Sequence, residues 1–211
     1  MPFRNEKRLT PCETPGVAGD ARQRPVARET DLAQITVGDV EVHDGPVALA
    51  EYDPAWPDRY SELEEQIREA LGGAALQIEH VGSTSVPGLI AKPIVDIVLV
   101  VADSAQEEAY VPALERAGYA VRVREPDWYE HRMLRGGGKD VNLHVFSAGC
   151  PEVERMLRFR DRLRSNAGDR ELYAAAKREL AARDWRHVQD YADAKTDVID
   201  EIVARASART G

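Results

Sequence analysis

Two apolar segments joined by a short polar turn make up residues 75–101, which read ALQIEHVGSTSVPGLIAKPIVDIVLVV. The first segment, 75–81, is bounded by a turn at Gly82, a pattern typical of a strand. The second segment, 94–101, is the most apolar run of the chain and is rich in β-branched residues. Such a run predicts a strand that is buried on both faces. The stretch therefore predicts the middle of a β-sheet.

One carboxylate, Asp96, interrupts the second of these strands. A buried charged group costs several kcal/mol unless it is paired with a cation, accepts hydrogen bonds or binds a metal. Taken alone, such a residue is more often a structural pair than a functional group. The position of Asp96, 13 residues after Ser83 in the turn, shifts the balance towards a binding site.

The turn itself, Gly82-Ser83-Thr84-Ser85, joins a glycine to three small hydroxyl residues. Backbone N–H groups in such a turn can approach an anion closely. Lys92, just before the second strand, would add a point charge to the same phosphate. The turn, Lys92 and Asp96 together predict a phosphate-binding site.

Outside this stretch, strands are expected to mix with helices as far as residue 150. Helical spacing predicts a helix that opens near Pro57 and runs to Leu71, and another over 105–117. From residue 151 the pattern is helical only. These segments predict an α/β (α+β) fold, a mixed β-sheet with flanking helices and a C-terminal helical part. The further strands are expected at 35–42, 47–52, 119–124, 130–134 and 141–146, and the C-terminal helices at 152–164, 169–182 and 184–206.

Length and composition predict one domain with a tail. The chain has 211 residues, of which 43% are hydrophobic, enough for a substantial core. Residues 1–30 are rich in Pro, Gly and Arg and lack any periodicity, which predicts a flexible tail. Residues 31–211 are then expected to form a single domain, with a sheet portion as far as about residue 150 and a helical portion over 151–206.

Charge and apolar patterning limit the classes of partner. The net charge of −9 argues against a nucleic-acid partner, but a few local cations would suffice for a nucleotide. No apolar run approaches the roughly 20 residues of a membrane span, and no signal peptide is present, so a cytoplasmic location is expected. Cys12 and Cys150 have no metal-site spacing, and we expect no disulfide between them.

Four stretches of the sequence resemble the GrpB family. The longest is the segment 79–97 described above, and the resemblance extends over about residues 46–206. The other stretches are Tyr52-Asp53-Pro54-Ala55-Trp56, Asn142-Leu143-His144-Val145-Phe146, and Phe159-Arg160-Asp161-Arg162-Leu163-Arg164 together with Tyr173 and Lys177.

The resemblance implies a nucleotidyltransferase-like fold. In that superfamily a Gly-Ser turn holds the nucleotide phosphates, and two acids spaced as Asp-x-Asp/Glu on the next strand bind a divalent metal, Mg²⁺ or Mn²⁺. Asp96 matches the first acid, but the second position is Val98. Two-metal phosphoryl transfer ordinarily uses several carboxylates, so Val98 departs from the enzyme pattern.

Three other residues are candidates to complete the metal site. Glu79 precedes the turn, and Asn142 and His144 share one face of a predicted neighbouring strand. An imidazole ligand would favour Mn²⁺ or Zn²⁺ over Mg²⁺. His144 could equally be a general base or a core residue, and the sequence leaves the three roles open.

Two cations on the predicted C-terminal helices, Arg160 and Lys177, could reach an anionic ligand if these helices fold over the sheet. A solvated helical face is the ordinary alternative for Arg160 and its neighbour Arg164.

The leading functional hypothesis is an enzyme of nucleotidyltransferase type. Asp96 and His144 would be the catalytic residues, and the nucleotide would be transferred to a small acceptor. One alternative is a non-catalytic accessory module that binds a nucleotide or coenzyme, which Val98 favours. Another is an enzyme that condenses an acyl or aminoacyl group, with His144 as the base. The sequence names neither the acceptor nor the oligomeric state.

Overall fold

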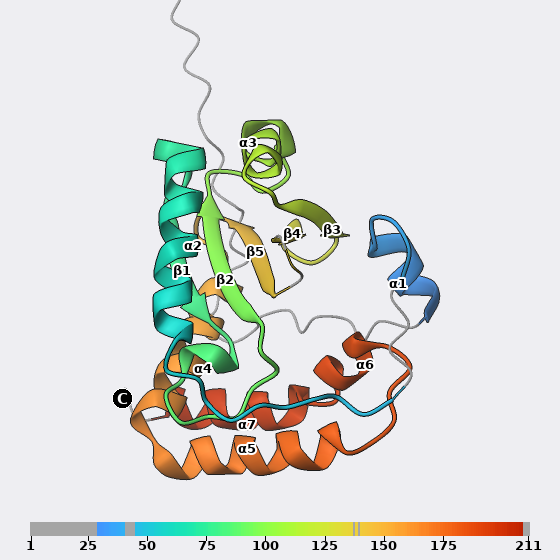
Figure 1. The fold of residues 1–211 in the computed structure, drawn as a ribbon, viewed down its shortest axis with the longest axis vertical. Helices are drawn as coiled ribbons and strands as arrows, with labels where there is room; N and C mark the ends of the chain where they lie inside the picture. Colours follow the sequence, from blue (N-terminus) through green and yellow to red (C-terminus); the bar gives the residue numbers. More distant parts are fainter. Residues whose placement is uncertain (1–28, 41–44, 137, 139, 209–211) are drawn as a thin grey trace, which may run out of the picture.

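A mixed five-stranded sheet forms the centre of the protein (Figure 1). The computed structural model describes residues 29–40, 45–136, 138 and 140–208. The strands lie in the order β1-β2-β5-β4-β3. Their bounds are Gln77–Val81 for β1, Val95–Val101 for β2, Ala120–Glu125 for β3, His131–Arg135 for β4 and Val141–Ser147 for β5.

The position of β2 inside the sheet explains why it is the most apolar segment. β2 pairs with β5 in parallel and with β1 in antiparallel fashion, so it has neighbours on both sides. Its side chains alternate between two buried clusters, with Ile97 and Leu99 in one and Val98 and Val100 in the other. The prediction of a strand buried on both faces is confirmed, and Asp96 is its one polar side chain.

One face of the sheet is covered by α2 (Trp56–Leu71) and α3 (Val111–Arg116). Ile67 of α2 is fully buried in the same cluster as Leu99 and Leu143, and each such side chain contributes about 1.5–3 kcal/mol. The helix expected over 105–117 is shorter than predicted. A 3-10 turn, η3 (Glu107–Ala109), precedes α3, which begins where Pro112 fits its first turn.

The C-terminal helical part lies against the other face and the lower end of the sheet (Figure 1). It comprises α4 (Pro151–Ser165), α5 (Ala167–Ala181), α6 (Val188–Asp193) and α7 (Thr196–Ser207). Asn166 ends α4 and caps α5 by accepting a hydrogen bond from the backbone N of Asp169, at 2.8 Å. The third expected helix, 184–206, is instead two helices that meet at Ala194 and Lys195.

Two expected strands do not form. Residues from Glu29 to Ile35 form α1, and Thr36 makes only an isolated bridge to Val123. The segment 47–52 has one bridge, Ala50 to Ala91, because Val47 packs against the C-terminal helices and not in the sheet. Residues 41 and 42 of the first segment lie outside the described residues.

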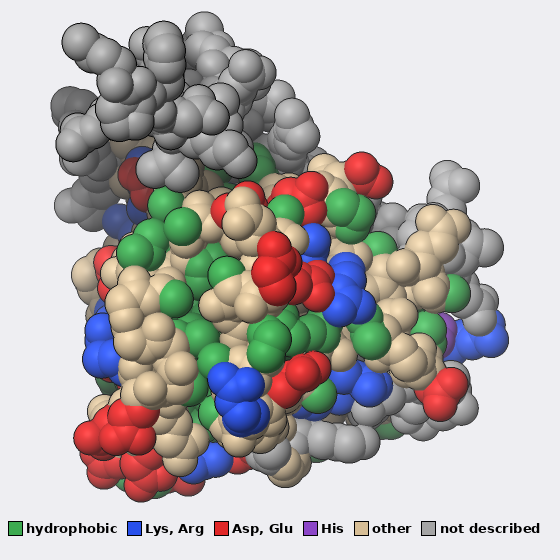
Figure 2. All heavy atoms as spheres, turned by 90° about the horizontal axis from the view of Figure 1, so that it is seen from above, with side chains coloured by type: hydrophobic (Ala, Val, Ile, Leu, Met, Phe, Trp, Pro, Cys, Tyr) green, Lys and Arg blue, Asp and Glu red, His purple; other side chains and the backbone are tan. Residues whose placement is uncertain are grey.

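The tail expected at 1–30 lies outside the described residues up to 28, and residues 29 and 30 belong to α1. Cys150 is buried, whereas Cys12 lies in the part that is not described. No helix of the described residues is long and apolar enough to cross a membrane. On the face drawn in Figure 2, acidic and basic side chains are interspersed, with hydrophobic side chains between them.

Candidate functional site

The turn after β1 lies directly against the carboxylate of Asp96. Gly82 has φ 67° and ψ −171°, and a Cβ at this position would stand 2.4 Å from Oδ2 of Asp96. Both the positive φ and the close approach therefore require glycine at residue 82. The Gly-Ser turn and the aspartate therefore lie next to each other in the fold.

The turn is held by its own hydroxyl groups. It continues as a 3-10 turn, η2 (Ser83–Ser85). Thr84 Oγ1 donates to the carbonyl of Ile94 at 3.2 Å, and Ser85 Oγ donates to the carbonyl of Gly82 at 2.6 Å. Of the three hydroxyl residues predicted to bind phosphate, Thr84 and Ser85 are thus buried and engaged within the protein, and only Ser83 is partly exposed.

Two residues of β5 face Asp96 across the parallel ladder. Asn142 is the register partner of Asp96, and His144 lies two residues further along the same face. Asn142 Nδ2 donates to Asp96 Oδ1 at 2.9 Å, and His144 Nε2 is 3.8 Å from the same oxygen. The structure therefore brings together Asp96, Asn142 and His144, as the sequence predicts.

Asp96 is held in its charged form. Burial alone would raise the pKa of this carboxyl, but His144, Asn142 and the positive charge of Lys195 outweigh burial and lower it. The side chain remains 29% exposed, so a ligand can reach it. The group is an ionised and accessible acceptor at neutral pH.

Two buried residues behind His144 orient its ring. Glu125 Oε2 is 2.7 Å from His131 Nδ1, and His131 Nε2 is 3.1 Å from His144 Nδ1. The carboxylate can only accept, so His131 donates from Nδ1, and a neutral His131 then accepts at Nε2 from His144. When Nε2 of His144 carries no proton, this assignment directs its lone pair to the side of Asp96, the usual arrangement behind an imidazole ligand. A proton on Nε2 donates to Asp96 instead, which is the effect of His144 that lowers the pKa of Asp96.

Two lysines, Lys177 and Lys195, lie close enough to Asp96 to interact with its charge. Lys177 of α5 is 2% exposed and donates to the carbonyl of Ile90. Burial lowers its pKa to about 7, with the charge of Lys195 acting in the same direction and Asp96 against both. Burial also lowers the pKa of Lys195 to about 8, opposed by Asp96 and assisted by Lys92. Lys177 and Lys195 thus both interact with the charge of Asp96, and Lys92 lies close enough to Lys195 to affect its pKa.

Tyr173 of α5 joins this group from the same helix as Lys177. Burial raises the pKa of Tyr173, and a hydrogen bond with Ser83 lowers it by a smaller amount. The C-terminal helices therefore fold over the turn, as the hypothesis for Lys177 requires.

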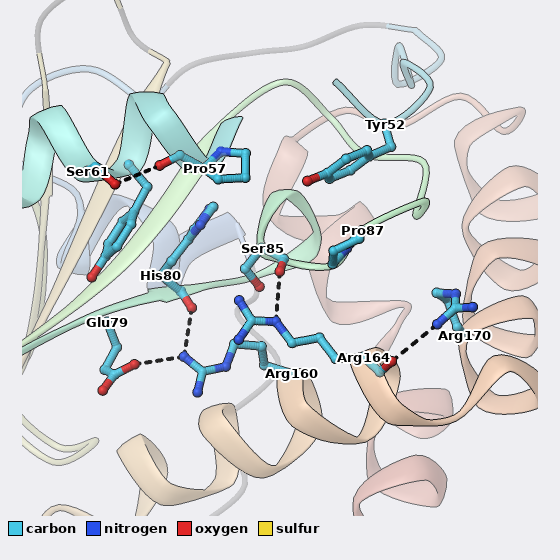
Figure 3. A pocket seen from close by; sticks show the side chains of 11 residues that line it. Tyr52, Pro57, Ser61, Glu79, His80, Ser85, Pro87, Arg160, Arg164 and Arg170 are labelled. Atoms are coloured by element: carbon cyan, nitrogen blue, oxygen red, sulfur yellow. Dashed lines mark hydrogen bonds and ion pairs between the residues drawn. The ribbon is translucent and has the colours of Figure 1, made fainter. Parts of the chain in front are cut away.

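Glu79 and Arg160 lie elsewhere. They form an ion pair at 2.8 Å, and Arg160 also donates to the carbonyl of His80. Glu79 pairs in the ladder with Val98, which separates it from His144. Both line a cavity (Figure 3). Among the described residues, no group of three or more His, Cys, Asp or Glu side chains is arranged to hold a metal.

The sequence matches a known protein family. A family profile described as GrpB protein matches residues 46–205. The chain belongs to the GrpB family. Its sequence is 56% identical over 180 residues to a UPF0157 protein of Halalkalibacterium halodurans, covering 85% of this chain and 92% of that protein. It is 49% identical over 173 residues to a UPF0157 protein of Streptomyces coelicolor, covering 80% and 91% of the two chains.

A solved structure supports the same family and fold. The crystal structure of the conserved protein GrpB from Enterococcus faecalis aligns with a TM-score of 0.68 and 30% sequence identity. The alignment covers 77% of this chain and 99% of that chain. The expected α/β fold, with a mixed sheet and flanking helices, is therefore confirmed.

Sequence reasoning missed two parts of the site. Lys195 was expected inside a continuous helix, but it lies at the junction of α6 and α7, where it reaches Asp96. Glu125 gave no signal, because its link to His131 depends on the pairing of β3 with β4.

Proposed function

We propose that this GrpB-family protein binds a nucleoside triphosphate with a divalent metal and transfers the nucleotidyl group to a small acceptor. The observation that carries the proposal is the contact of Gly82 with an ionised Asp96, which lies near His144 and interacts with the charges of Lys177 and Lys195. A metal-bound triphosphate needs this pairing of an anionic metal ligand with nearby cations.

The donors at Asp96 fit a divalent metal. Its carboxylate and the free lone pair of His144 Nε2 converge, and the buried Oδ1 of Asn142 has no hydrogen-bond partner among the described residues. With two protein ligands, the remaining positions would be filled by phosphate oxygens and water, as is common for nucleotide-bound cations. Mn²⁺ accepts both carboxylate and imidazole, and we therefore favour it over Mg²⁺. A bound metal would neutralise charge that develops on the phosphates.

The lysines would hold the phosphates. Burial depresses the pKa values of both Lys177 and Lys195, and an anion placed near them would favour the charged form of both. Ser83 and the backbone of the turn complete the cradle, with Lys92 at its edge. Reaction would depend on positioning and charge neutralisation.

His144 can have one of two roles, because Nε2 has a single lone pair. As a metal ligand it belongs to the nucleotidyltransferase proposal. As a general base it fits an enzyme that condenses an acyl or aminoacyl group. A third candidate, a non-catalytic module that binds a nucleotide or coenzyme, is favoured by Val98 at the second acid position.

The proposal includes small-molecule partners only, and a cytoplasmic location. It includes neither a nucleic acid nor a membrane. These expectations rest on the net charge of −9 and on the lack of a membrane-crossing helix among the described residues.

Calorimetry with nucleoside triphosphates tests the proposal. We expect saturable binding in Mn²⁺, loss of most affinity in EDTA, and release of pyrophosphate when a panel of small alcohols, amines and phosphates is added. Asp96→Asn should abolish the metal dependence. Tight nucleotide binding without turnover of any nucleotide with any acceptor would establish the binding module instead. Absence of nucleotide binding both with and without metal would refute the proposal.

A further inference from the structure

A cavity of about 650 Å³ opens at the free edge of β1, beside the turn η2 (Figure 3). Side chains from α2, β1, the turn and the C-terminal helices converge on it. Asp96, His144 and Lys177 do not line it. The cavity is therefore separate from the proposed nucleotide site. Its volume falls within the range of pockets that hold small organic molecules.

Three arginines line this cavity, and their charges are not equally balanced. The charge of Arg160 is balanced by two carboxylates, because Arg160 forms ion pairs with Glu79 at 2.8 Å and with Asp161 at 2.7 Å. Arg164 donates from Nε to the carbonyl of Ser85 at 2.9 Å, and its Nη1 lies 3.8 Å from the already paired Asp161.

Arg170 completes the trio without a counter-charge. It donates from Nη1 to the carbonyl of Leu163 at 3.0 Å, and within the described residues it has no ion pair with a carboxylate. Arg164 and Arg170 thus give the cavity an excess of positive charge in a protein whose net charge is −9. Burial, together with the neighbouring Arg160, lowers the pKa of Arg164, which is consistent with this excess.

The other walls are aromatic and uncharged. Tyr60 stacks on His80, with ring centroids 4.7 Å apart and planes 9° apart. Burial lowers the pKa of His80 to about 4 against the effect of Asp96, so this ring is neutral near pH 7. Tyr52 and Pro87 line the part of the cavity that lies away from Glu79 in Figure 3. These walls suit the organic part of a ligand and not a bare ion.

We propose that this cavity is a binding site for a small organic phosphate. Its phosphoryl group lies between Arg164 and Arg170, and its organic part lies against Tyr52 and Pro87. Guanidinium groups bind phosphate through paired N–H donors, which accounts for arginine at both positions. This site does not depend on the proposed nucleotidyl transfer.

The position of Arg164 links the cavity to the turn. Arg164 holds the carbonyl of Ser85, and Ser85 Oγ holds the carbonyl of Gly82, which contacts Asp96 on the far side. A ligand on Arg164 therefore binds at the back of the turn whose front faces the proposed nucleotide site.

Phenyl phosphate is a suitable probe, because it combines a phosphoryl group with one ring. Isothermal calorimetry of the full chain should show one saturable site. Arg164→Gln and Arg170→Gln should each weaken binding at least about tenfold, since each removes one charged donor pair. Arg178→Gln is the matched control, because Arg178 is an exposed arginine of α5 that pairs with Glu171. It should bind the probe like the wild type.

Two further variants separate this site from the proposed nucleotide site and from a general loss of fold. Lys177→Met should leave the affinity for phenyl phosphate unchanged. Arg164→Lys keeps the positive charge but loses the paired N–H donors of the guanidinium group. It should bind phenyl phosphate with intermediate affinity and melt like the wild type. Benzoate, of similar size, should bind more weakly than phenyl phosphate.

Several results would overturn the assignment. These are non-saturable binding, equal losses in Arg178→Gln and Arg164→Gln, or benzoate binding as tightly as phenyl phosphate. If Lys177→Met lost phenyl phosphate binding while Arg164→Gln and Arg170→Gln retained it, the phosphate would bind beside Asp96 instead. The nucleotide assay with Mn²⁺ is a separate measurement, so failure of either proposal can be recognised without the other.

Discussion

The backbone of Gly82 and the carboxylate of Asp96 occupy adjoining space, with only 2.4 Å between Oδ2 and the place where a Cβ on residue 82 would stand. This contact joins the residue that follows β1 to the second residue of β2. It also changes the meaning of a substitution at Gly82. If the turn only bound an anion, Gly82→Val would remove anion binding and leave the fold intact; in the structure, any side chain at residue 82 displaces the aspartate.

We therefore predict that Gly82→Ala destabilises the protein as well as its site. The positive φ costs about 1–2 kcal/mol, and displacement of Asp96 adds to it. Gly88→Ala is the matched control, because Gly88 also has a positive φ, of 77°, but a Cβ there meets nothing within 4 Å. Urea unfolding of both variants measures the difference. Equal losses in the two would show that the contact with Asp96 has no energetic weight.

Asp96→Asn should destabilise the protein even in EDTA. The carboxylate accepts from Asn142 and lies near His144 and Lys195, so the protein itself compensates the charge. We expect a loss of about 1–3 kcal/mol, as for a removed hydrogen bond to a charged group. Without these partners the opposite outcome would follow, because a buried and uncompensated carboxylate is costly and asparagine would remove that cost.

The same carboxyl predicts a dependence on pH. Its pKa is lower in the folded than in the unfolded protein, so its contribution is present above the unfolded value near 4 and is lost as the pH falls through the folded value. Wild type should therefore lose more stability than Asp96→Asn on acidification below about pH 4. Parallel curves of unfolding free energy against pH would contradict the assignment.

The sequence predicts the strand–turn–strand unit well, because each of its signals is local. Apolar runs, a glycine and β-branched residues all lie within residues 75–101. Val47 and Leu49 show the limit of this reasoning. Their alternation is that of a strand, but they pack against the C-terminal helices, and no local pattern distinguishes the two kinds of burial.

The parts of the site that could not be predicted depend on distant pairings. Lys195 reaches Asp96 only because the chain turns between α6 and α7. Glu125 meets His131 through the register of β3 with β4. Both are decided by tertiary packing, which overrides the local helical pattern at Lys195 and leaves no trace in the spacing of Glu125.

His131→Gln tests the orientation of His144. If Glu125 and His131 fix the tautomer that frees His144 Nε2, their loss should weaken Mn²⁺ affinity about 10- to 100-fold in the presence of nucleotide. Paramagnetic resonance of free Mn²⁺ measures the affinity. His187→Asn is the control, since His187 is a buried histidine at the start of α6 and asparagine can retain its capping role. Equal Mn²⁺ affinity in wild type and His131→Gln would remove the positioning role.

Lys177→Met should separate stability from binding. Lys177 has a folded pKa of about 7, below the usual value near 10.4 for an unfolded lysine. Between these values the unfolded chain binds a proton that the folded chain does not, so this lysine makes stability rise with pH from about 7 to 10. Below pH 7 both states are charged, and the cost of the buried charge is present in full.

Methionine removes that cost, and Lys177→Met should melt at a higher temperature than wild type at pH 6, with a smaller rise in stability towards pH 10. It should also bind nucleoside triphosphate more weakly, because a cation beside Asp96 is lost. Differential scanning calorimetry at both pH values, with nucleotide titrations at pH 7, measures these effects; a variant that is less stable at pH 6 and binds nucleotide normally would make Lys177 a structural residue.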